Sequence, residues 1–323
     1  MTINSAKKLN SELLEAIKRA IPANTNLVKV IEAELKIGKE GVYRRIRGDV
    51  PFTFREVVAL FLKFGMSLDR FFGITYNGKA VFDLNHIYEP SVWEDYYNIL
   101  SIDVEMFKEF NRHSAATLHL AYNILPVVFY SSLDVLWRFD LYRCLHQLKK
   151  EKRMMDFAEM VVPAQVVAMR DQLFASFSQV PHSSYILDRK VISSLIKEIH
   201  YFHQLRLISD EDKQSLKEEL LTLLNEWGMI MATGKCKNGN DVTFYLSNID
   251  IEASYCSYEC PQMNFSHLRI YRIGVLNSSS QNVYKAQRGY LESLKRFSTL
   301  VTVSGELERR SFLETQRELI MTL

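Results

Sequence analysis

The chain has 323 residues, of which 47% are hydrophobic and 24% are charged, and its formal net charge is +2. This balance excludes a disordered or strongly polyionic chain, and the length predicts about two domains. The charge is uneven along the chain, because residues 1–75 contain 13 Lys and Arg against 8 Asp and Glu. A basic head on a slightly acidic body is typical of a polyanion-binding module joined to a second domain.

Four cysteines in a chain of this length exclude a disulfide-stapled scaffold. The amino-terminal segment "MTINSAKKLNSELLEAIKRAIP" is amphipathic and lacks the apolar core of a signal peptide. The longest apolar candidate, "ILPVVFY" at 124–130, is far shorter than the ~18–20 residues of a membrane span. We therefore expect a cytoplasmic protein without a membrane partner.

Apolar spacing in the first 65 residues predicts a series of short helices over 10–20, 26–35 and 39–47, the last of them basic. Gly48 stands where a left-handed cap would end the third helix. Thr53 and Glu56 form a capping box that predicts the start of a fourth helix, which Gly65 ends. A fifth helix is expected from Ser67, so that the head is a compact five-helix bundle.

This order of helices resembles the lambda-repressor/Cro-like, or XRE-type, helix-turn-helix domain over about residues 10–73. The residues that carry the resemblance are "VYRRIRG" at 42–48, similar to the end of a recognition helix with its glycine cap, and "PFTFREVVALFLKFGMSLDRFFG" at 51–73, similar to the family's last two helices. The resemblance implies a short helix that enters the major groove of DNA and a function in transcription regulation.

The chain departs from the family pattern at three positions around the turn and the basic helix. Lys36 occupies the turn position where the family usually has glycine, and Glu32 stands where a small residue is usual. Gly38 is expected to take over part of the bending. Arg45 falls where the family more often has an apolar or aromatic residue, so its direction is left open.

If Val42 and Ile46 face the bundle, the opposite face of the basic helix points outward. Cations there neutralise phosphates and reach guanine edges, while a carboxylate accepts from a cytosine amine and an aromatic ring contacts a sugar or a thymine methyl. The predicted DNA-contact set is Lys39, Glu40, Tyr43, Arg44 and Arg47, together with Thr53 at the start of the next helix. The alternative interpretation is a solvated cationic helix.

The rest of the chain is expected to be a linker over 76–91 and a sensor or oligomerisation domain over 92–323. Residues 92–227 are mostly helical by pattern, with a candidate strand at 116–126. Asn238-Gly239 predicts a hairpin within 229–249, and 267–276 alternates like a further strand. Ser304 is the expected N-cap of a last helix. The fold class is therefore mainly α with a small antiparallel sheet (α+β).

Two segments of this second domain, "ATLHLAYNILPVVFY" and "STLVTVSGELERRSFLETQ", resemble parts of large helix-turn-helix regulators of Bacteroidetes-type bacteria. The aromatic-rich stretches at 92–97 and 129–139 are candidates to line a ligand pocket, although ordinary core packing is the favoured interpretation. The alternative of a zinc site concerns Cys236, Cys256, Cys260 and His267. Their spacing is unusual for zinc ligands, and buried thiols are the favoured interpretation.

The sequence contains no G-x-x-x-x-G-K-[ST], G-x-G-x-x-G or G-x-S-x-G motif, so nothing indicates an enzyme or a cofactor. We expect a homodimeric, sequence-specific regulator that binds double-stranded DNA and responds to a small-molecule or peptide effector. The alternative of a different class is a protein-interaction bundle attached to an uncharacterised enzyme or scaffold domain.

Overall fold

The chain folds into two compact units, Met1–Val81 and Phe82–Leu323. The second unit begins inside the segment expected to be a linker, since residues 83–85 belong to its sheet. The computed structural model describes residues 3–21, 25–66, 68, 71, 80–88, 91–148, 155–261, 263–270 and 272–323.

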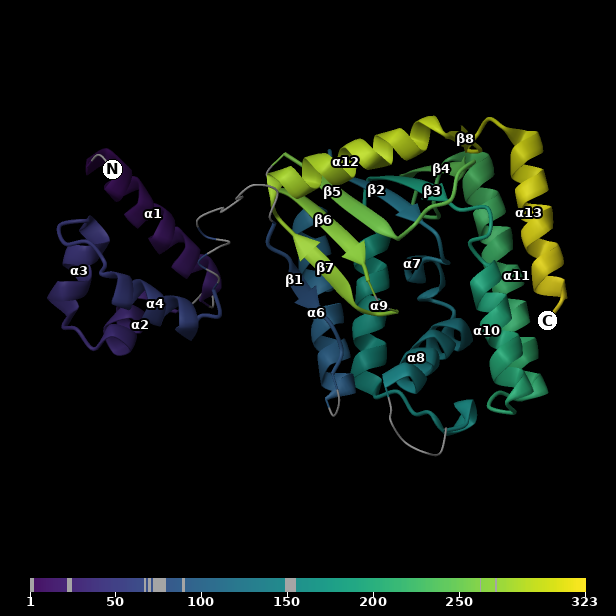
Figure 1. Ribbon diagram of the computed structural model, residues 1–323, viewed down its shortest axis with the longest axis horizontal. Coiled ribbons are helices and arrows are strands. Elements are labelled where there is room, and N and C mark those ends of the chain that lie inside the picture. Colours follow the sequence, from purple (N-terminus) through teal and green to yellow (C-terminus); the bar gives the residue numbers. More distant parts are fainter. Residues whose placement is uncertain are drawn as a thin grey trace. The chain divides into compact units, whose positions relative to one another are not determined.

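The first unit is built from short helices that share one apolar core (Figure 1). The described helices are α1 (Ile3–Ala20), α2 (Leu27–Leu35), α3 (Lys39–Arg47) and α4 (Phe54–Lys63). The core is formed by Leu13, Leu14, Ile17, Ile31, Val42, Leu60 and Phe61. The helix expected from Ser67 lies largely outside the described residues, although Leu68 and Phe71 do pack against this core.

Three of the expected helix ends are confirmed in this unit. Gly48 closes α3 with φ of 79°, a left-handed conformation that glycine adopts without strain. Thr53 and Glu56 form the capping box of α4, and Gly65 follows that helix with φ of 59°. The first helix differs from expectation because it begins at Ile3 and not at residue 10.

The second unit contains a mixed sheet, and the expected fold class with its small antiparallel sheet is therefore wrong. In the described part of the chain the sheet has eight strands in the order β1-β7-β6-β5-β2-β3-β4-β8. Its strands are β1 (Asp83–Asn85), β2 (Thr117–Tyr122), β3 (His182–Leu187), β4 (Asp241–Ser247), β5 (Tyr255–Cys260), β6 (Met263–Arg269), β7 (Val275–Ser278) and β8 (Ser298–Leu300).

The centre of this sheet is parallel, with Leu120 of β2 beside Tyr185 of β3 and Tyr185 beside Phe244 of β4. Parallel neighbours need long crossover connections, so their pairing is invisible to local sequence patterns. The candidate strand at 116–126 is confirmed as β2. In contrast, β3 lies inside the region that was expected to be helical, because a six-residue strand between helices has too little periodicity to identify.

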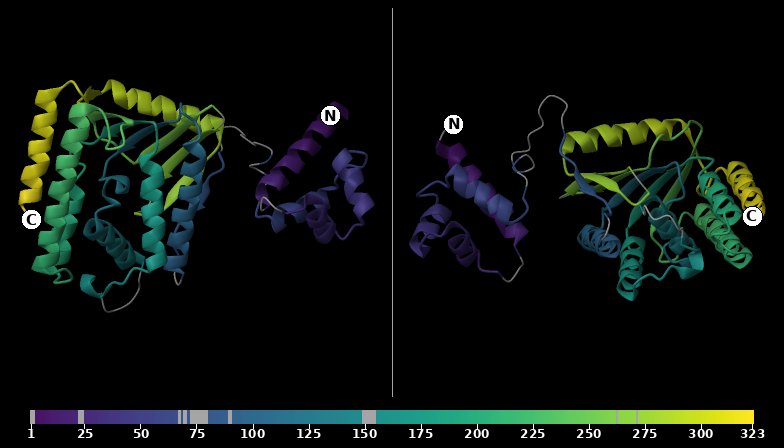
Figure 2. Two further views of the ribbon diagram at one scale, coloured as in Figure 1. Left: turned by 180° about the vertical axis from the view of Figure 1, so that it is seen from behind. Right: turned by 60° about the horizontal axis from the view of Figure 1, so that its bottom comes forward.

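Helices cover both faces of the sheet (Figures 1 and 2). On one face, α12 packs over the small core formed by Ala121, Ile186, Ile251, Leu291 and Leu294. The main core lies between the other face and the remaining helices. The helices of this unit are α6 (Val92–Phe110), α7 (Val127–Tyr130), α8 (Asp134–Leu148), α9 (Ala164–Ser178), α10 (Ser193–Gln204), α11 (Asp210–Thr233), α12 (Gln281–Arg296) and α13 (Glu306–Met321), with a 3-10 turn η1 (Phe157–Glu159).

Three local expectations in this unit are corrected. The hairpin around Asn238-Gly239 is reduced to a tight turn with one antiparallel bridge, between Lys235 and Asp241, because α11 extends to Thr233 and occupies most of what was expected to be the first strand. The segment 267–276 is interrupted, with β6 ending at Arg269 and β7 starting at Val275. The N-cap of α13 is Gly305 and not Ser304. This left-handed position requires glycine, because a Cβ there would lie 2.3 Å from the carbonyl oxygen of Leu300.

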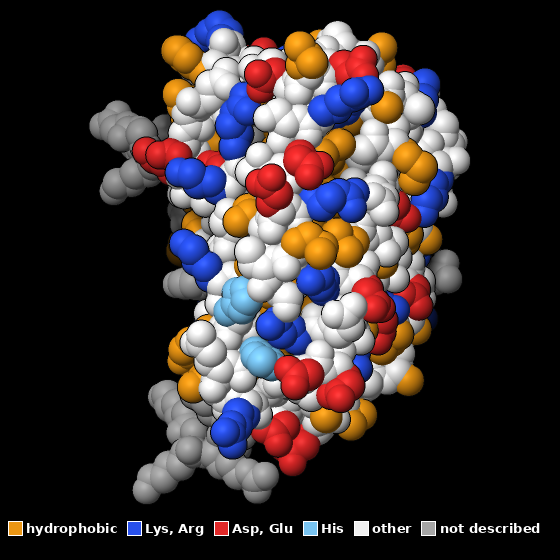
Figure 3. Space-filling view, turned by 90° about the vertical axis from the view of Figure 1, so that its right-hand side faces the viewer, with side chains coloured by type: hydrophobic (Ala, Val, Ile, Leu, Met, Phe, Trp, Pro, Cys, Tyr) orange, Lys and Arg blue, Asp and Glu red, His pale blue; other side chains and the backbone are white. Residues whose placement is uncertain are grey.

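The side of the second unit that carries α13 has interspersed Lys, Arg, Asp and Glu side chains, with hydrophobic side chains scattered singly or in small groups (Figure 3). Within the described parts of the chain, no helix is both long and apolar enough to cross a membrane.

Candidate nucleic-acid interface

The basic helix α3 is held by its apolar side. Val42 is fully buried and Ile46 packs against the same core, while α2 contacts both α3 and α4. From α1, the amide nitrogen of Asn10 donates to the carbonyl oxygen of Arg45 at 2.9 Å. The helix is therefore anchored near both ends, and its outward face carries the exposed side chains of Lys39, Glu40, Tyr43, Arg44 and Arg47.

The turn between α2 and α3 is made at Lys36, which has φ of 52° and ψ of 39°. This is the position where the family that the sequence resembles usually has glycine, and the backbone here has the left-handed conformation that glycine favours. Gly38 does not take over the bend, because its φ is −64° and it is the extended N-cap of α3. That expectation is corrected: the turn is formed by a strained lysine.

Arg45, whose direction the sequence left open, points into the unit. Its guanidinium donates to both carboxylate oxygens of Glu56, at 2.6 and 3.1 Å, and to the carbonyl oxygen of Gly41 at 3.1 Å. Both side chains of the pair are 15% exposed. A bidentate pair of this geometry fixes α3 against α4. Arg45 is therefore a structural residue and does not belong to the outward cationic face of α3.

Glu56 takes part in this pair and in the cap of α4 at once. One of its oxygens accepts from the backbone amide of Thr53 at 2.8 Å. Burial alone would raise the pKa of the Glu56 carboxyl, but the hydrogen bonds from Arg45 and Thr53 outweigh it, and the pKa lies below its ordinary value of 4.5. The sequence revealed the capping box, whereas the link to Arg45 depends on how α3 and α4 pack.

Thr53, the predicted contact outside α3, is exposed and acts as the N-cap of α4. Its hydroxyl oxygen accepts from the amide of Glu56 at 3.3 Å. The hydroxyl hydrogen remains a donor, which is the group that a phosphate oxygen would accept. Its capping role is the observed one, and a contact with DNA stays a prediction.

Arg47 shares its charge with two neighbouring carboxylates on the surface. Its Nε donates to Asp49 at 2.9 Å, and Nη2 lies 3.4 Å from Glu40. The hydrogen bond to Asp49, with a smaller contribution from Glu40, raises the pKa of the Arg47 guanidinium above its ordinary value. The side chain is 53% exposed, so these pairs are solvated and a phosphate can replace them at little cost.

Lys39 and Arg44 are the cations that the outward face offers most directly. Both are exposed, and neither makes an ion pair with any residue that the structure describes. Tyr43 is 38% exposed beside them. The predicted contact residues of α3 therefore share one surface, which can donate to phosphates or to guanine O6 and N7 and can stack a ring on a sugar.

The cysteines considered for zinc do not form a comparable site. Cys256 and Cys260 are buried in β5, and Cys256 pairs across the sheet with His267 of β6. Burial raises the pKa of the Cys256 thiol to about 12, and burial also lowers the pKa of His267 to about 4. Among the described residues, no three His, Cys, Asp or Glu side chains converge as metal ligands would.

Comparisons of the chain with protein-family models, with curated proteins and with solved structures found no match.

Proposed function

We propose that this protein is a sequence-specific, DNA-binding transcriptional regulator whose first unit places α3 in the major groove. The observation that supports this most is the division of labour among the arginines of α3. Arg45 is committed to the fold through Glu56, whereas Arg44 is exposed without an ion pair in the described part of the chain.

The order of α2, a tight turn and α3 supports the same proposal. A short helix held by a buried Val42, with charged side chains opposite it, has the dimensions and polarity of a recognition helix. A single unit of this size offers few contacts, so two copies are expected to read half-sites about one helical turn apart. The second unit would then sense an effector or hold two copies together.

The decisive experiment compares variants of the full chain on duplexes selected from a random library, with binding measured by fluorescence anisotropy at several salt concentrations. Arg44→Ala and Arg47→Ala should each lower affinity by about 1–3 kcal/mol and reduce the salt slope by roughly one. Lys18→Ala is the matched control, because it removes an exposed cation from α1. The DNA affinity of the Lys18→Ala protein should change only by the small amount that the loss of any one exposed cation causes.

Unchanged affinity in the Arg44/Arg47 double variant would refute the contact assignment. If no duplex is selected at all, the regulator proposal fails, and a protein-interaction bundle becomes the better explanation for the first unit.

A further inference from the structure

The second unit contains a partly open cavity of about 140 Å³ between its sheet and its helices. Most of its wall is apolar and rich in aromatic rings, from Tyr96 and Phe107 of α6, Trp137 of α8, Phe177 of α9 and Tyr258 of β5. An engineered apolar cavity of roughly 150 Å³ is large enough to bind benzene. The two aromatic-rich stretches of the sequence, 92–97 and 129–139, thus contribute both to the core and to the wall of a cavity.

Two carboxyl groups, those of Asp103 and Asp140, interrupt this apolar wall. Asp103, on α6, is half-buried and lines the cavity. Burial raises the pKa of the Asp103 carboxyl to about 7, and no neighbouring cation opposes this shift. Within the described residues, Asp103 has neither a hydrogen bond nor an ion pair, which is unusual for a half-buried carboxyl in a largely apolar wall.

The other charged groups of the cavity wall are already paired. Arg170 forms ion pairs with Asp134 at 3.0 Å and Asp171 at 2.8 Å, and its guanidinium lies 4.3 Å from the centre of the Trp137 ring. Asp140 is paired with Arg143 and lies 3.5 Å from Arg272. Asp103 is therefore the carboxylate of this wall that has no partner among the described residues.

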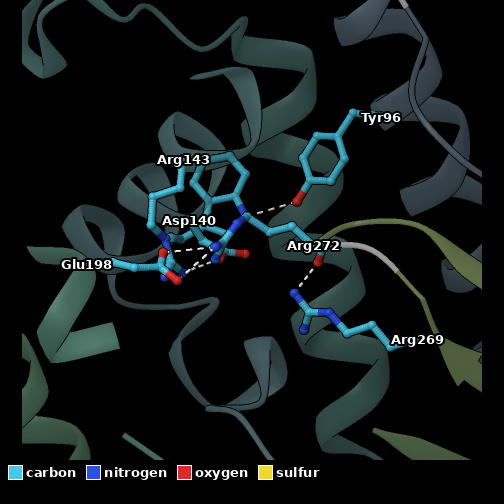
Figure 4. Close-up of polar contacts among 7 residues, drawn as sticks. Tyr96, Asp140, Arg143, Glu198, Arg269 and Arg272 are labelled. Atoms are coloured by element: carbon cyan, nitrogen blue, oxygen red, sulfur yellow. Dashed lines mark hydrogen bonds and ion pairs between the residues drawn. The ribbon is translucent and has the colours of Figure 1, made fainter. Parts of the chain in front are cut away.

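Figure 4 shows how the arginines and carboxylates next to Trp137 and Tyr96 are paired. Arg272 donates to Glu198 at 2.8 Å, Arg143 donates to the same carboxylate at 2.7 Å, and Arg269 donates to the carbonyl oxygen of Arg272. Trp137 donates to the hydroxyl of Tyr96 at 3.2 Å. The charged groups of this cluster are thus paired with one another, whereas Asp103 offers the cavity an acceptor without a partner among the described residues.

We propose that this cavity binds a small apolar molecule that carries one protonated amine, with the ammonium group on Asp103 and the apolar part between the aromatic rings. A carboxylate gives an ammonium group a charge-assisted hydrogen bond. The faces of Tyr96, Phe107, Trp137 and Tyr258 add cation–π attraction in a site shielded from water. The proposal concerns the second unit alone and stands whether or not the first unit binds DNA.

The affinity of such a ligand should depend on pH through Asp103, because the ammonium needs the ionised carboxyl. The other titratable groups that line the cavity do not change charge between pH 6 and 8. Burial raises the pKa of Tyr96 and of Tyr258 far above this range and that of Cys256 to about 12, while His267 is neutral with a pKa of about 4. Arg170, Arg269 and Arg272 stay cationic throughout. Binding should tighten about tenfold from pH 6 to pH 8.

The test is isothermal titration of the full chain with isopentylamine, benzylamine and phenethylamine, and with benzyl alcohol as a neutral match for benzylamine. At least one amine should bind, and benzyl alcohol should bind at least tenfold more weakly than benzylamine. Asp103→Asn should weaken amine binding by about 10- to 100-fold and abolish its pH dependence. Glu105→Gln, an exposed carboxylate on the same helix, is the matched control and should leave binding unchanged.

Asp103→Asn removes a buried charge, so the variant is expected to fold, and its unfolding midpoint shows that a loss of binding is not a loss of structure. The proposal is overturned if none of the three amines binds. It is equally overturned if the Asp103→Asn protein retains amine binding with the pH dependence of the original chain.

Discussion

Arginine serves opposite purposes in the two units. In the second unit, the Arg143 side chain is 7% exposed and is paired with Asp140 and Glu198. In α3 of the first unit, Arg44 is exposed, with no ion pair among the described residues. A buried guanidinium without partners would cost several kcal/mol, whereas an exposed one stays available to a polyanion. The number of arginines therefore says little about function until the partners of each are known.

The largest effect should come from breaking the buried cluster. Arg143→Ala leaves the buried Asp140 with Arg272 at 3.5 Å as its remaining partner and removes one of the two arginines on Glu198, and we expect the second unit to lose about 3–5 kcal/mol of unfolding free energy. Urea unfolding followed by tryptophan fluorescence reports this unit alone, because all three tryptophans, Trp93, Trp137 and Trp227, belong to it. Arg112→Ala, which removes an exposed pair with Glu109, is the control and should cost less than about 1 kcal/mol. A similar loss in both variants would contradict the comparison.

A second prediction concerns the unpaired carboxyl of the same unit. The pKa of Asp103 is raised from its ordinary 3.8 to about 7, so its ionisation opposes folding, and its contribution to stability is lost as pH rises from about 4 to 7. Asp103→Asn should therefore stabilise the second unit at pH 8 by about 1–3 kcal/mol and by little at pH 4. Unfolding midpoints from tryptophan fluorescence at the two pH values test this, and a destabilised variant at pH 8 would show that the carboxylate has a partner.

Two adjacent arginines of α3 provide the sharpest test within the first unit. Arg45→Ala removes the pair with Glu56 and should speed amide hydrogen exchange across residues 39–63, with a loss of about 1–3 kcal/mol. Arg44→Ala should leave this exchange unchanged and should weaken DNA binding. Exchange measured by mass spectrometry separates the two effects. Equal protection losses in both variants would mean that Arg44 is also part of the fold.

The Arg45–Glu56 pair also predicts how the first unit responds to acid. The pKa of Glu56 in the folded protein lies below its ordinary value of 4.5, so its stabilisation is present above that value and is lost as pH falls through the folded value. Glu56→Gln should make the protection of α3 and α4 less sensitive to pH in this range. If the variant keeps the full acid sensitivity, other carboxylates are responsible.

The smallest effect is expected at the turn. Lys36→Gly relieves a left-handed lysine and should stabilise the first unit by about 0.5–1 kcal/mol. Arg44→Gly, at an exposed position in the interior of α3, should cost about 1 kcal/mol, because glycine is unfavourable within a helix. Hydrogen exchange of α2 and α3 should therefore slow in the first variant and accelerate in the second. Two changes of the same sign would contradict the assigned turn.

The sequence predicted the first unit far better than the second. Its helices are short and close to one another along the chain, and the residues that begin and end them, such as Thr53 and Gly48, act on neighbours within a few positions. The outward contact set of α3 followed from helical periodicity. The capping of α4 by Thr53 followed from the capping-box pattern. The partner of Arg45 could not be predicted in this way, because it is eleven residues away on another helix.

The second unit was mispredicted wherever strands pair over a distance. β1 pairs with β7 from the far end of the chain, and β2 lies between β3 and β5 with opposite directions on its two sides. Such pairings leave no local period to read. Asp103 was missed for a related reason, since a single aspartate in a helix resembles any surface residue until the packing of α6 against the sheet places it in a cavity.

Local sequence determined the helices of the first unit, their caps and the face of α3 that carries its charges, because helix periodicity and capping depend on residues a few positions apart. Tertiary structure decided the parallel centre of the sheet, the burial of Arg45 and Arg143 and the isolation of Asp103. Those outcomes depend on which distant segments pack together, and the free energy of a charge is set by the groups that surround it in space.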